Sequence, residues 1–525
     1  MEHLSEKKKV TVVIALMVVM FFAAINQTLV SNSMPRIIAI LGGMDHYSWV
    51  MTAYMLASCI ATVLVGKLSD IYGRKPFLLV GIIVFMIGTF LCGLSKDIFQ
   101  MITFRAVQGA GAGILMSSTI TAVGDLFAPR ERAKWTGTMM AVFGFSSVVG
   151  PTLGGFMIDH MEWKWLFWTF LPLGIVAFLL IWRLFPQVKR DYDQAIDYWG
   201  SLFLSLSIVA LLLAFSWAGT KYPWGSIEIL GLFAMSVICA GILVMIESKV
   251  KNPVLPLSLF KNGIVTISNL IGFLMNAAMM GTMMYLPFFL QGVEGLSPSQ
   301  SGLINIPMSL SMVVFSSLVG VWISKTGKYK RYAFLGVGVM FLGMVLMVFM
   351  DDVILAVIST CVFGLGLGLC TPVFTLAAQN AVPASQLGVV TATSTLFRNL
   401  GGTIGIAVFG SVMSSAFTRK MEAQIQASGG LDLSNVDAET AQQLTGLLSP
   451  EILLDQPKLK TLGETLPTQV QDVFLQMIEL LRTVLHESIA IVFISGSALL
   501  VVAGILVIFL KEIPLRSSQQ KTTES

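Results

Sequence analysis

Long apolar runs dominate this chain, and its charged residues gather between them. The runs are roughly 18 to 25 residues long, which is the length an α-helix rising about 1.5 Å per residue needs to cross about 30 Å of hydrocarbon. Every backbone polar group must find its partner inside such a segment, so each run is expected to be helical. A content of 55% apolar and only 12% charged residues is far outside the range of soluble proteins. The sequence therefore predicts an all-α polytopic membrane protein.

Fourteen apolar runs can be separated along the chain. They cover residues 10–30, 48–65, 77–95, 98–122, 135–157, 165–185, 199–219, 227–246, 264–286, 300–323, 332–350, 353–376, 387–412 and 487–510. An even number of spans places both termini on the same side of the membrane. We therefore expect 14 transmembrane helices with the two termini together.

Basic residues indicate which side the termini occupy. Lysines and arginines gather in the two tails and in every second loop, at 7–9, 67–75, 130–134, 189–190, 249–261, 325–331 and 511–516. The opposite loops carry mainly Asp and Glu. Since cytoplasmic loops are enriched in Lys and Arg, we expect both the N and C termini to be cytoplasmic. The net charge of +4 is then a signal of orientation, and no nucleic-acid partner is expected.

A weak internal repeat divides the chain. GKLSDIYGRK at 66–75 aligns with GVWISKTGKY at 320–329, and both segments follow an apolar run at its cytoplasmic end. We predict an N-terminal six-helix bundle over 1–195, two additional transmembrane helices over 196–255, and a C-terminal six-helix bundle over 256–525. Parallel repeats with a binding site at their interface are typical of transporters.

The C-terminal bundle contains one long hydrophilic stretch, 418–485, which is expected to be an external loop. Apolar residues between Val470 and Leu485 recur at helical spacing, so an amphipathic helix should lead into the last span. Two roles stay open for this loop: a tether that lies partly on the membrane surface, or a functional gate.

Three motifs carry a resemblance to a known family. They are GKLSDIYGRKP at 66–76, RAVQGAG at 105–111 and GPTLGG at 150–155. The set resembles the major facilitator superfamily over nearly the whole chain, which implies the major facilitator fold. The first motif implies a conformational switch at Gly66, Asp70, Gly73 and Arg74. Glycines at 109, 111 and 113, and again at 364, 366 and 368, lie in apolar runs with no preceding strand, so close helix packing is expected rather than a nucleotide-binding loop.

GPTLGG resembles the antiporter motif of that superfamily, with Gly150, Pro151, Gly154 and Gly155 in place. Together with 14 spans, the Trp163-Lys-Trp165 pair and the segment 398–402, it is similar to the fourteen-helix drug:proton antiporter family of the multidrug efflux type. The resemblance implies a cell-membrane exporter of drugs or other small amphipathic molecules, acting as a monomer by alternating access. Its partners would be a small-molecule substrate, protons as the coupling ion and the lipid bilayer.

Two positions within the spans are critical for coupling. Arg105 lies about seven residues inside a span, where a charge is expensive and usually functional. Asn26 occupies the place at which the resembled family usually has Asp, and an asparagine cannot titrate. Three mechanisms stay open: coupling through a boundary acid, with Asp159 and Glu294 as possible proton carriers; transport down a gradient; or an anionic substrate coupled by charge movement through a positive interior.

The resemblance places the substrate cavity between the two bundles. The polar candidates for substrate binding or coupling are Asn26, Gln27, Arg105, Gln108, Asn276, Asn305, Gln379 and Arg398. An exporter dedicated to one endogenous metabolite, an anion for example, is the alternative function. The chain lacks a catalytic Ser/His/Asp cluster, metal-ligand spacing and a phosphate-binding loop, so we expect no enzyme activity, no metal and no cofactor.

Overall fold

The fold is described from a computed structural model covering residues 5–43, 46–127, 129–186, 197–218, 221–250, 257–383, 386–427, 451–454, 456–465 and 468–514. The first half comprises α1 (Glu6–Leu41), α2 (Tyr47–Tyr72), α3 (Arg74–Gly93), α4 (Ile98–Leu126), α5 (Pro129–His160), α6 (Trp165–Trp168) and α7 (Leu171–Leu184). Two helices follow, α8 (Tyr198–Trp217) and α9 (Ile227–Glu247). The remainder comprises η2 (Leu257–Lys261), α10 (Gly263–Phe288), η3 (Phe289–Val293), α11 (Pro298–Thr326), α12 (Lys330–Val348), α13 (Val353–Asn380), α14 (Leu387–Ala427), α16 (Glu451–Leu454), α17 (Gln456–Thr465) and α18 (Thr468–Phe509).

Every apolar run predicted from the sequence coincides with helix in the described residues. Thirteen helical segments are long and apolar enough to cross a membrane, and the apolar part of α2, Trp49–Thr62, is shorter. The chain is therefore an all-α, multi-pass membrane protein, while the count of fourteen stays a prediction. The run at 165–185 is not one continuous helix as predicted. It divides into α6 and α7, because Pro172 stands in the first turn of α7 and lacks the N–H that a continuous helix requires there.

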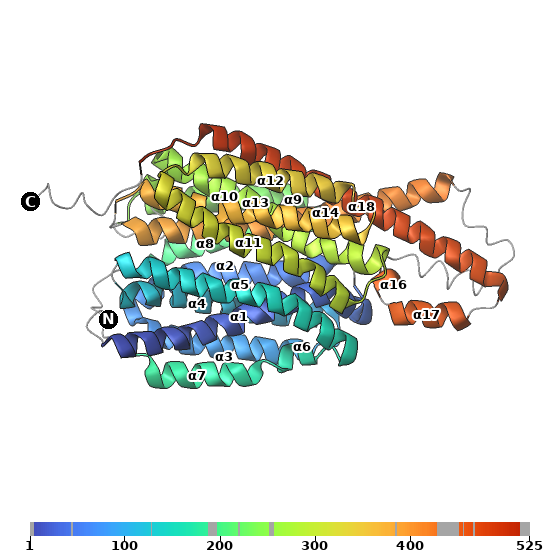
Figure 1. The fold of residues 1–525 in the computed structure, drawn as a ribbon, viewed down its shortest axis with the longest axis horizontal. Coiled ribbons are helices and arrows are strands. Elements are labelled where there is room, and N and C mark those ends of the chain that lie inside the picture. Colours follow the sequence, from blue (N-terminus) through green and yellow to red (C-terminus); the bar gives the residue numbers. More distant parts are fainter. Residues whose placement is uncertain are drawn as a thin grey trace, which may run out of the picture.

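The two halves repeat the same packing. In the first half α2 and α3 pack on α4, and α1 packs on α5 and α7. In the second half α11 and α12 pack on α13, and α10 packs on α14 and α18. The halves meet through two equivalent seams, α5 against α11 and α2 against α14. Figure 1 shows the helices running side by side, with the start of α1 and the end of α18 at the same end of the molecule.

Local details support the sequence repeat. Gly73 ends α2 with φ of 90°, and Gly327 ends α11 with φ of 69°, so both copies turn at a conformation that glycine adopts readily. Asp97 caps α4 by accepting a hydrogen bond from the N–H of Gln100 (2.9 Å), and Asp352 caps α13 in the same way. Equivalent turns and caps at equivalent positions favour a duplicated six-helix unit.

The predicted role of the glycine stripes is confirmed. An added Cβ on Gly111 would lie 2.6 Å from the Cα of Phe85 on α3, and one on Gly366 would lie 2.7 Å from a carbonyl oxygen on α12. Gly109 and Gly113 face the backbone of α2 from the other side of α4. The stripes therefore let α4 and α13 approach two neighbours at backbone contact distance.

The two helices between the halves lie beside one seam. Apolar residues of α8, Leu204, Ile208 and Leu212, pack with Cys59 of α2 and Leu396 of α14. α9 packs on α8 and exposes much of its apolar surface. α8 thus covers the seam between α2 and α14, whereas the domain boundaries proposed from the sequence stay a prediction.

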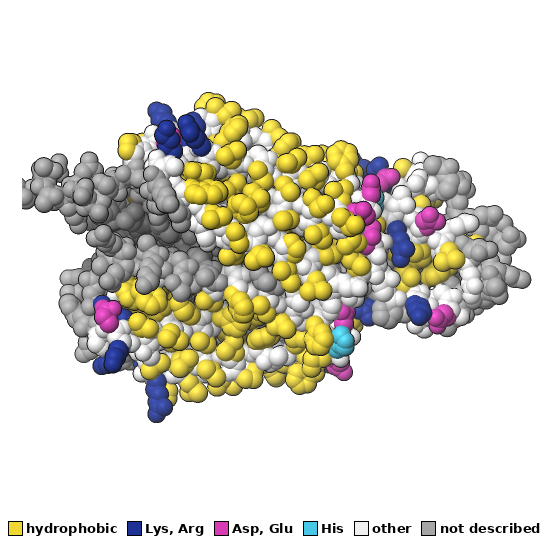
Figure 2. Space-filling view, in the orientation of Figure 1, with side chains coloured by type: hydrophobic (Ala, Val, Ile, Leu, Met, Phe, Trp, Pro, Cys, Tyr) yellow, Lys and Arg dark blue, Asp and Glu magenta, His cyan; other side chains and the backbone are white. Residues whose placement is uncertain are grey.

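The surface is divided by residue type. Figure 2 shows a broad apolar band with Lys and Arg side chains at both of its ends, and with most of the acidic side chains at the end away from the start of α1. The prediction of cytoplasmic termini depends on the distribution of Lys and Arg among the loops of the sequence.

The predicted external loop is largely helical at its two ends. α14 continues to Ala427, and α18 begins at Thr468, so the amphipathic helix expected before the last span is present. Its buried face includes Phe474, Met477 and Leu481. Residues 428–450 lie outside the described residues.

Candidate functional site

Arg105 is the centre of a polar cluster in the first half. Its guanidinium donates from Nη1 to Oε1 of Gln108, and Nη2 lies 3.4 Å from the sulfur of Met51. It stacks over the ring of Tyr54 at 4.2 Å, and Gln108 in turn donates to the hydroxyl of Thr89 (2.7 Å). The side chain of Arg105 is fully buried.

No carboxylate contacts this guanidinium among the described residues, and its Nε has no hydrogen-bond partner there. A buried cation needs compensation, and here the compensation comes from an amide oxygen, a thioether and an aromatic face. The site consequently keeps a net positive charge and an unused donor. Such a group in a membrane interior is a candidate for binding or coupling.

Asn26 lies on α1, which packs against α4. Its Nδ2 donates to the carbonyl oxygen of Phe22 (2.9 Å), whereas its Oδ1 is buried without a partner. Within the described residues no hydrogen bond joins Asn26 to Arg105, although both side chains are buried. Gln27 is half-buried.

A second polar group lies in the other half, between α10, α13 and α14. Nδ2 of Asn276 donates to the backbone oxygen of Arg398 (2.6 Å), and Gln379 donates to the hydroxyl of Thr391 (2.8 Å). Arg398 is partly exposed, and its guanidinium has no hydrogen bond or ion pair with any described residue. Asn305 is half-buried on α11. The sequence candidates therefore fall into two groups, one in each half.

The GPTLGG segment of α5 contacts both α1 and the opposite half. A Cβ on Gly154 would lie 2.6 Å from the carbonyl oxygen of Leu29 on α1. One on Gly155 would lie 2.6 Å from the Cα of Ser299 on α11. Gly302 of α11 approaches Pro151 just as closely. The motif is thus a place where the two halves come into backbone contact.

Polar contacts close the same helices at the end away from the two termini, which is the outer end in the predicted orientation. The backbone N–H of Ser299, in the first turn of α11, donates to Oδ2 of Asp159 at the end of α5 (3.1 Å). The hydroxyl of Tyr47 on α2 donates to the carbonyl oxygen of Met284 on α10 (3.2 Å). Asp159 is exposed, and Glu294 is the C-cap residue of η3. Asp159 therefore caps a helix of the opposite half.

The short helix α16 adds to this closure. Ile452, Leu453 and Leu454 are buried in the same apolar cluster as the outer part of α1. α16 contacts α1 of the first half and η3 and α18 of the second. Gln456, next to it, donates to the backbone oxygen of Gln291 (3.2 Å). A segment of the predicted external loop thus bridges the two halves at this end.

The switch motif is described only in part. Gly66 and Asp70 belong to α2, but their burial and contacts lie outside what the structure describes. Gly73 forms the turn into α3, and Arg74, the first residue of α3, is buried and donates to the hydroxyl of Ser69.

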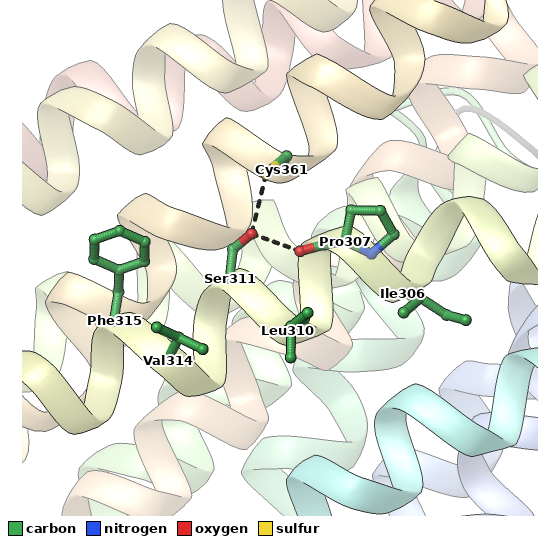
Figure 3. Close-up of a pocket in the computed structure, with 7 residues that line it drawn as sticks. All are labelled: Ile306, Pro307, Leu310, Ser311, Val314, Phe315 and Cys361. Atoms are coloured by element: carbon green, nitrogen blue, oxygen red, sulfur yellow. Dashed lines mark hydrogen bonds between the residues drawn. The ribbon is translucent and has the colours of Figure 1, made fainter.

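A shallow cavity of about 350 Å³ lies between α11 and α13 (Figure 3). Its lining is apolar except for Ser311, whose hydroxyl contacts the carbonyl oxygen of Pro307 and the thiol of Cys361. Leu310 and Val314 are exposed on the outer surface of α11. This cavity therefore opens on the apolar surface, away from the two polar groups.

Sequence reasoning missed several contributors to these sites, among them Tyr54, α16 and Asn269, whose Oδ1 accepts a hydrogen bond from the hydroxyl of Ser394 (2.6 Å). Asn269 is a polar residue in an apolar run and carried the same signal as Asn276. Tyr54 and α16 gave no comparable signal, because a tyrosine in a span and a four-residue apolar stretch in a loop are both common.

Comparison with known proteins identifies the family. The model of the Major Facilitator Superfamily matches residues 16–406. The multidrug transporter protein MdtP of Bacillus subtilis is 36% identical, covering 99% of this chain and 96% of its own length. Multidrug resistance protein 3 of the same organism is 34% identical, over 78% of this chain and 80% of the relative.

Solved structures share the fold. A bacterial homologue of the human lysosomal transporter Spinster, in an inward-facing and occupied conformation, aligns with a TM-score of 0.64 at 14% identity, covering 96% of this chain and 97% of that one. A D-xylose-proton symporter aligns with a TM-score of 0.56 at 13% identity, covering 78% and 90%. The chain belongs to the Major Facilitator Superfamily, a family of membrane transporters, and the two relatives above are named a multidrug transporter and a multidrug resistance protein.

Proposed function

We propose that this protein exports drugs or other small amphipathic molecules from the cell by alternating access, as a proton-driven antiporter. The observation that supports the proposal best is the closed outer seam between the halves. Gly155 and Pro151 of the GPTLGG segment contact the backbone of α11, and Asp159 caps that helix across the seam. A closed outer side is one of the two states that alternating access requires.

Asp159 is the proposed point of action for external protons. Its carboxylate accepts a hydrogen bond from the positive end of α11, and the ionised form stabilises that contact more than the neutral form does. Because the side chain is exposed on the outer side, an external proton can reach it. Protonation then weakens the closed state and favours opening, which is the step through which a substrate leaves.

The test is proton flux linked to substrate export in proteoliposomes. We expect Asp159→Asn to reduce this flux at least tenfold, because Asn cannot change charge. Asp97→Asn is the matched control, since it removes an external carboxylate that caps a helix within one half only, and asparagine caps as well as aspartate. Glu294→Gln is measured separately. Unchanged flux in both Asp159→Asn and Glu294→Gln would refute coupling through a boundary acid.

A further inference from the structure

The second half contains a cation that nothing in the described residues neutralises. Arg398 lies within the apolar span Thr393–Gln426 of α14. Its guanidinium makes no hydrogen bond or ion pair with any described residue. The interaction that holds Arg398 in place involves its backbone oxygen, which accepts from Asn276. An unpaired guanidinium inside a membrane span costs free energy, so its presence there indicates a functional role.

The aliphatic stem of Arg398 runs against α10. A Cβ placed on Gly272 would lie 3.3 Å from Cγ and 3.7 Å from Cδ of Arg398. Leu396 and Ile404, on another face of α14, pack with α2 and α8. The absence of a side chain at position 272 therefore gives the arginine its space along α10.

A second unused donor lies one helical turn away. Asn269 on α10 is 2% exposed, and its Oδ1 accepts from the hydroxyl of Ser394 (2.6 Å). Its Nδ2 is buried without a partner among the described residues. Positions 269 and 272 are neighbours on one helix face, because residues three apart on a helix lie about 5–6 Å from each other. Ser394 likewise lies one turn before Arg398 on α14. The contact of Asn269 with Ser394 and the contact of Gly272 with Arg398 are therefore stacked along the α10–α14 interface.

All the unused groups at this place are donors. A guanidinium offers five N–H groups and a carboxamide nitrogen two, and neither can accept a hydrogen bond. The sequences of α10 and α13 contain no Asp or Glu, and in α14 the one acid, Glu422, lies near its far end. A cationic substrate would meet repulsion here, whereas a carboxylate, sulfonate or phosphate would complete the missing pairs.

We propose that Arg398 and Asn269 form an anion-binding subsite for the acidic head group of an amphipathic substrate. This inference rests on the proposed export function and specifies its substrate class. Ser394 orients the amide of Asn269, and Asn276 fixes the backbone of Arg398, so both act as positioning residues.

Three dansyl compounds that differ mainly in head-group charge provide the test: dansylglycine (anionic), dansylglycinamide (neutral) and dansylcadaverine (cationic). Binding is measured by fluorescence titration of the full chain in lipid nanodiscs. We expect the wild type to bind dansylglycine at least tenfold more tightly than dansylcadaverine. Arg398→Gln should weaken dansylglycine binding at least tenfold and leave dansylglycinamide within twofold.

Two further variants separate the subsite from a general loss of structure. Arg398→Lys should stay within threefold of the wild type, and Asn269→Ala should weaken dansylglycine threefold to tenfold with the arginine intact. Arg419→Gln is the control, because it removes a charge from an exposed position on the same helix. Dansylglycine binding that is equal in Arg398→Gln and Arg419→Gln, or a wild-type preference for dansylcadaverine, would overturn the proposal. If the anionic preference holds but proteoliposomes export none of the three compounds, the subsite stands and the proposed function fails.

Discussion

The α5–α11 seam permits a quantitative test of alternating access through one added methyl group. In Gly155→Ala the new Cβ would lie 2.6 Å from the Cα of Ser299 and 2.5 Å from the carbonyl carbon of Pro298. These are backbone atoms in the capped first turn of α11, so relief requires the helices to separate. Overpacking of this kind costs about 1–3 kcal/mol. Since 1.36 kcal/mol is a factor of ten, the ratio of outer-closed to outer-open molecules should fall about 5-fold to 150-fold.

The assay is electron–electron distance measurement between spin labels on the two sides of the seam. Phe156 on α5 and Leu303 on α11 are exposed apolar positions, suited to labelling after replacement by cysteine in a background whose five native cysteines are changed to alanine. Gly155→Ala should shift the population toward longer distances. Gly320→Ala is the matched control, because it adds a methyl group on α11 where no atom lies within 4 Å. Identical distance distributions in the two variants would refute the claim that this contact holds the outer side closed.

Four further predictions concern the ends of the fold and the first helix. Replacing Leu453, which is fully buried in α16, by Asp should release α16 and increase proteolysis of the outer loop in intact cells; unchanged cleavage would show that α16 does not seal the outside. Glu512→Ala should lower the free energy of unfolding by about 1 kcal/mol, as measured by thermal unfolding. Glu512 accepts hydrogen bonds from the N–H groups of Tyr329 and Lys330 at the start of α12, and the substitution removes both. Burial raises the pKa of Tyr329, and the charge of Glu512 adds to this effect. The free energy of unfolding should therefore also fall as the pH rises past about 10, where an exposed tyrosine ionises. A flat profile of stability against alkaline pH would contradict this. Asn26→Asp should make export steeper in pH than in the wild type, and an unchanged pH profile would place position 26 off the coupling path.

Much of the fold could be predicted from hydrophobic runs alone, because the bilayer leaves the backbone few choices. All the runs are helical, and the glycine stripes pack as expected. The extra-membrane features could not be predicted in the same way. Nothing in the apolar pattern places α16 between α1 and η3, because that contact depends on tertiary packing and not on the membrane. The break between α6 and α7 follows from Pro172, a signal that hydropathy ignores.

For the candidate site, individual residues could be predicted from the sequence, but the contacts between them could not. Arg105, Asn276 and Arg398 became candidates because they are polar residues in apolar runs. A polar side chain inside a membrane span costs free energy and is usually functional. Their partners could not be inferred, because partners come from helices distant in sequence. The exposed Asp159 illustrates this, since its hydrogen bond joins residues 140 positions apart. A single sequence gives no measure of such pairs.

The GPTLGG segment connects the outer seam to the helix that carries Asn26. Its glycines contact different partners: Gly150 and Gly154 face α1, whereas Gly155 faces α11 of the opposite half. One turn before the motif, the carbonyl oxygen of Ser146 accepts a hydrogen bond from Thr28, two residues beyond Asn26 (3.0 Å). At these distances α5 has no free space on either side, so it cannot separate from α11 as the seam opens without moving against α1 or carrying α1 with it. The packing thus gives the segment a mechanical role that does not depend on titration at position 26, and an exporter with asparagine there retains the connection between its outer seam and α1.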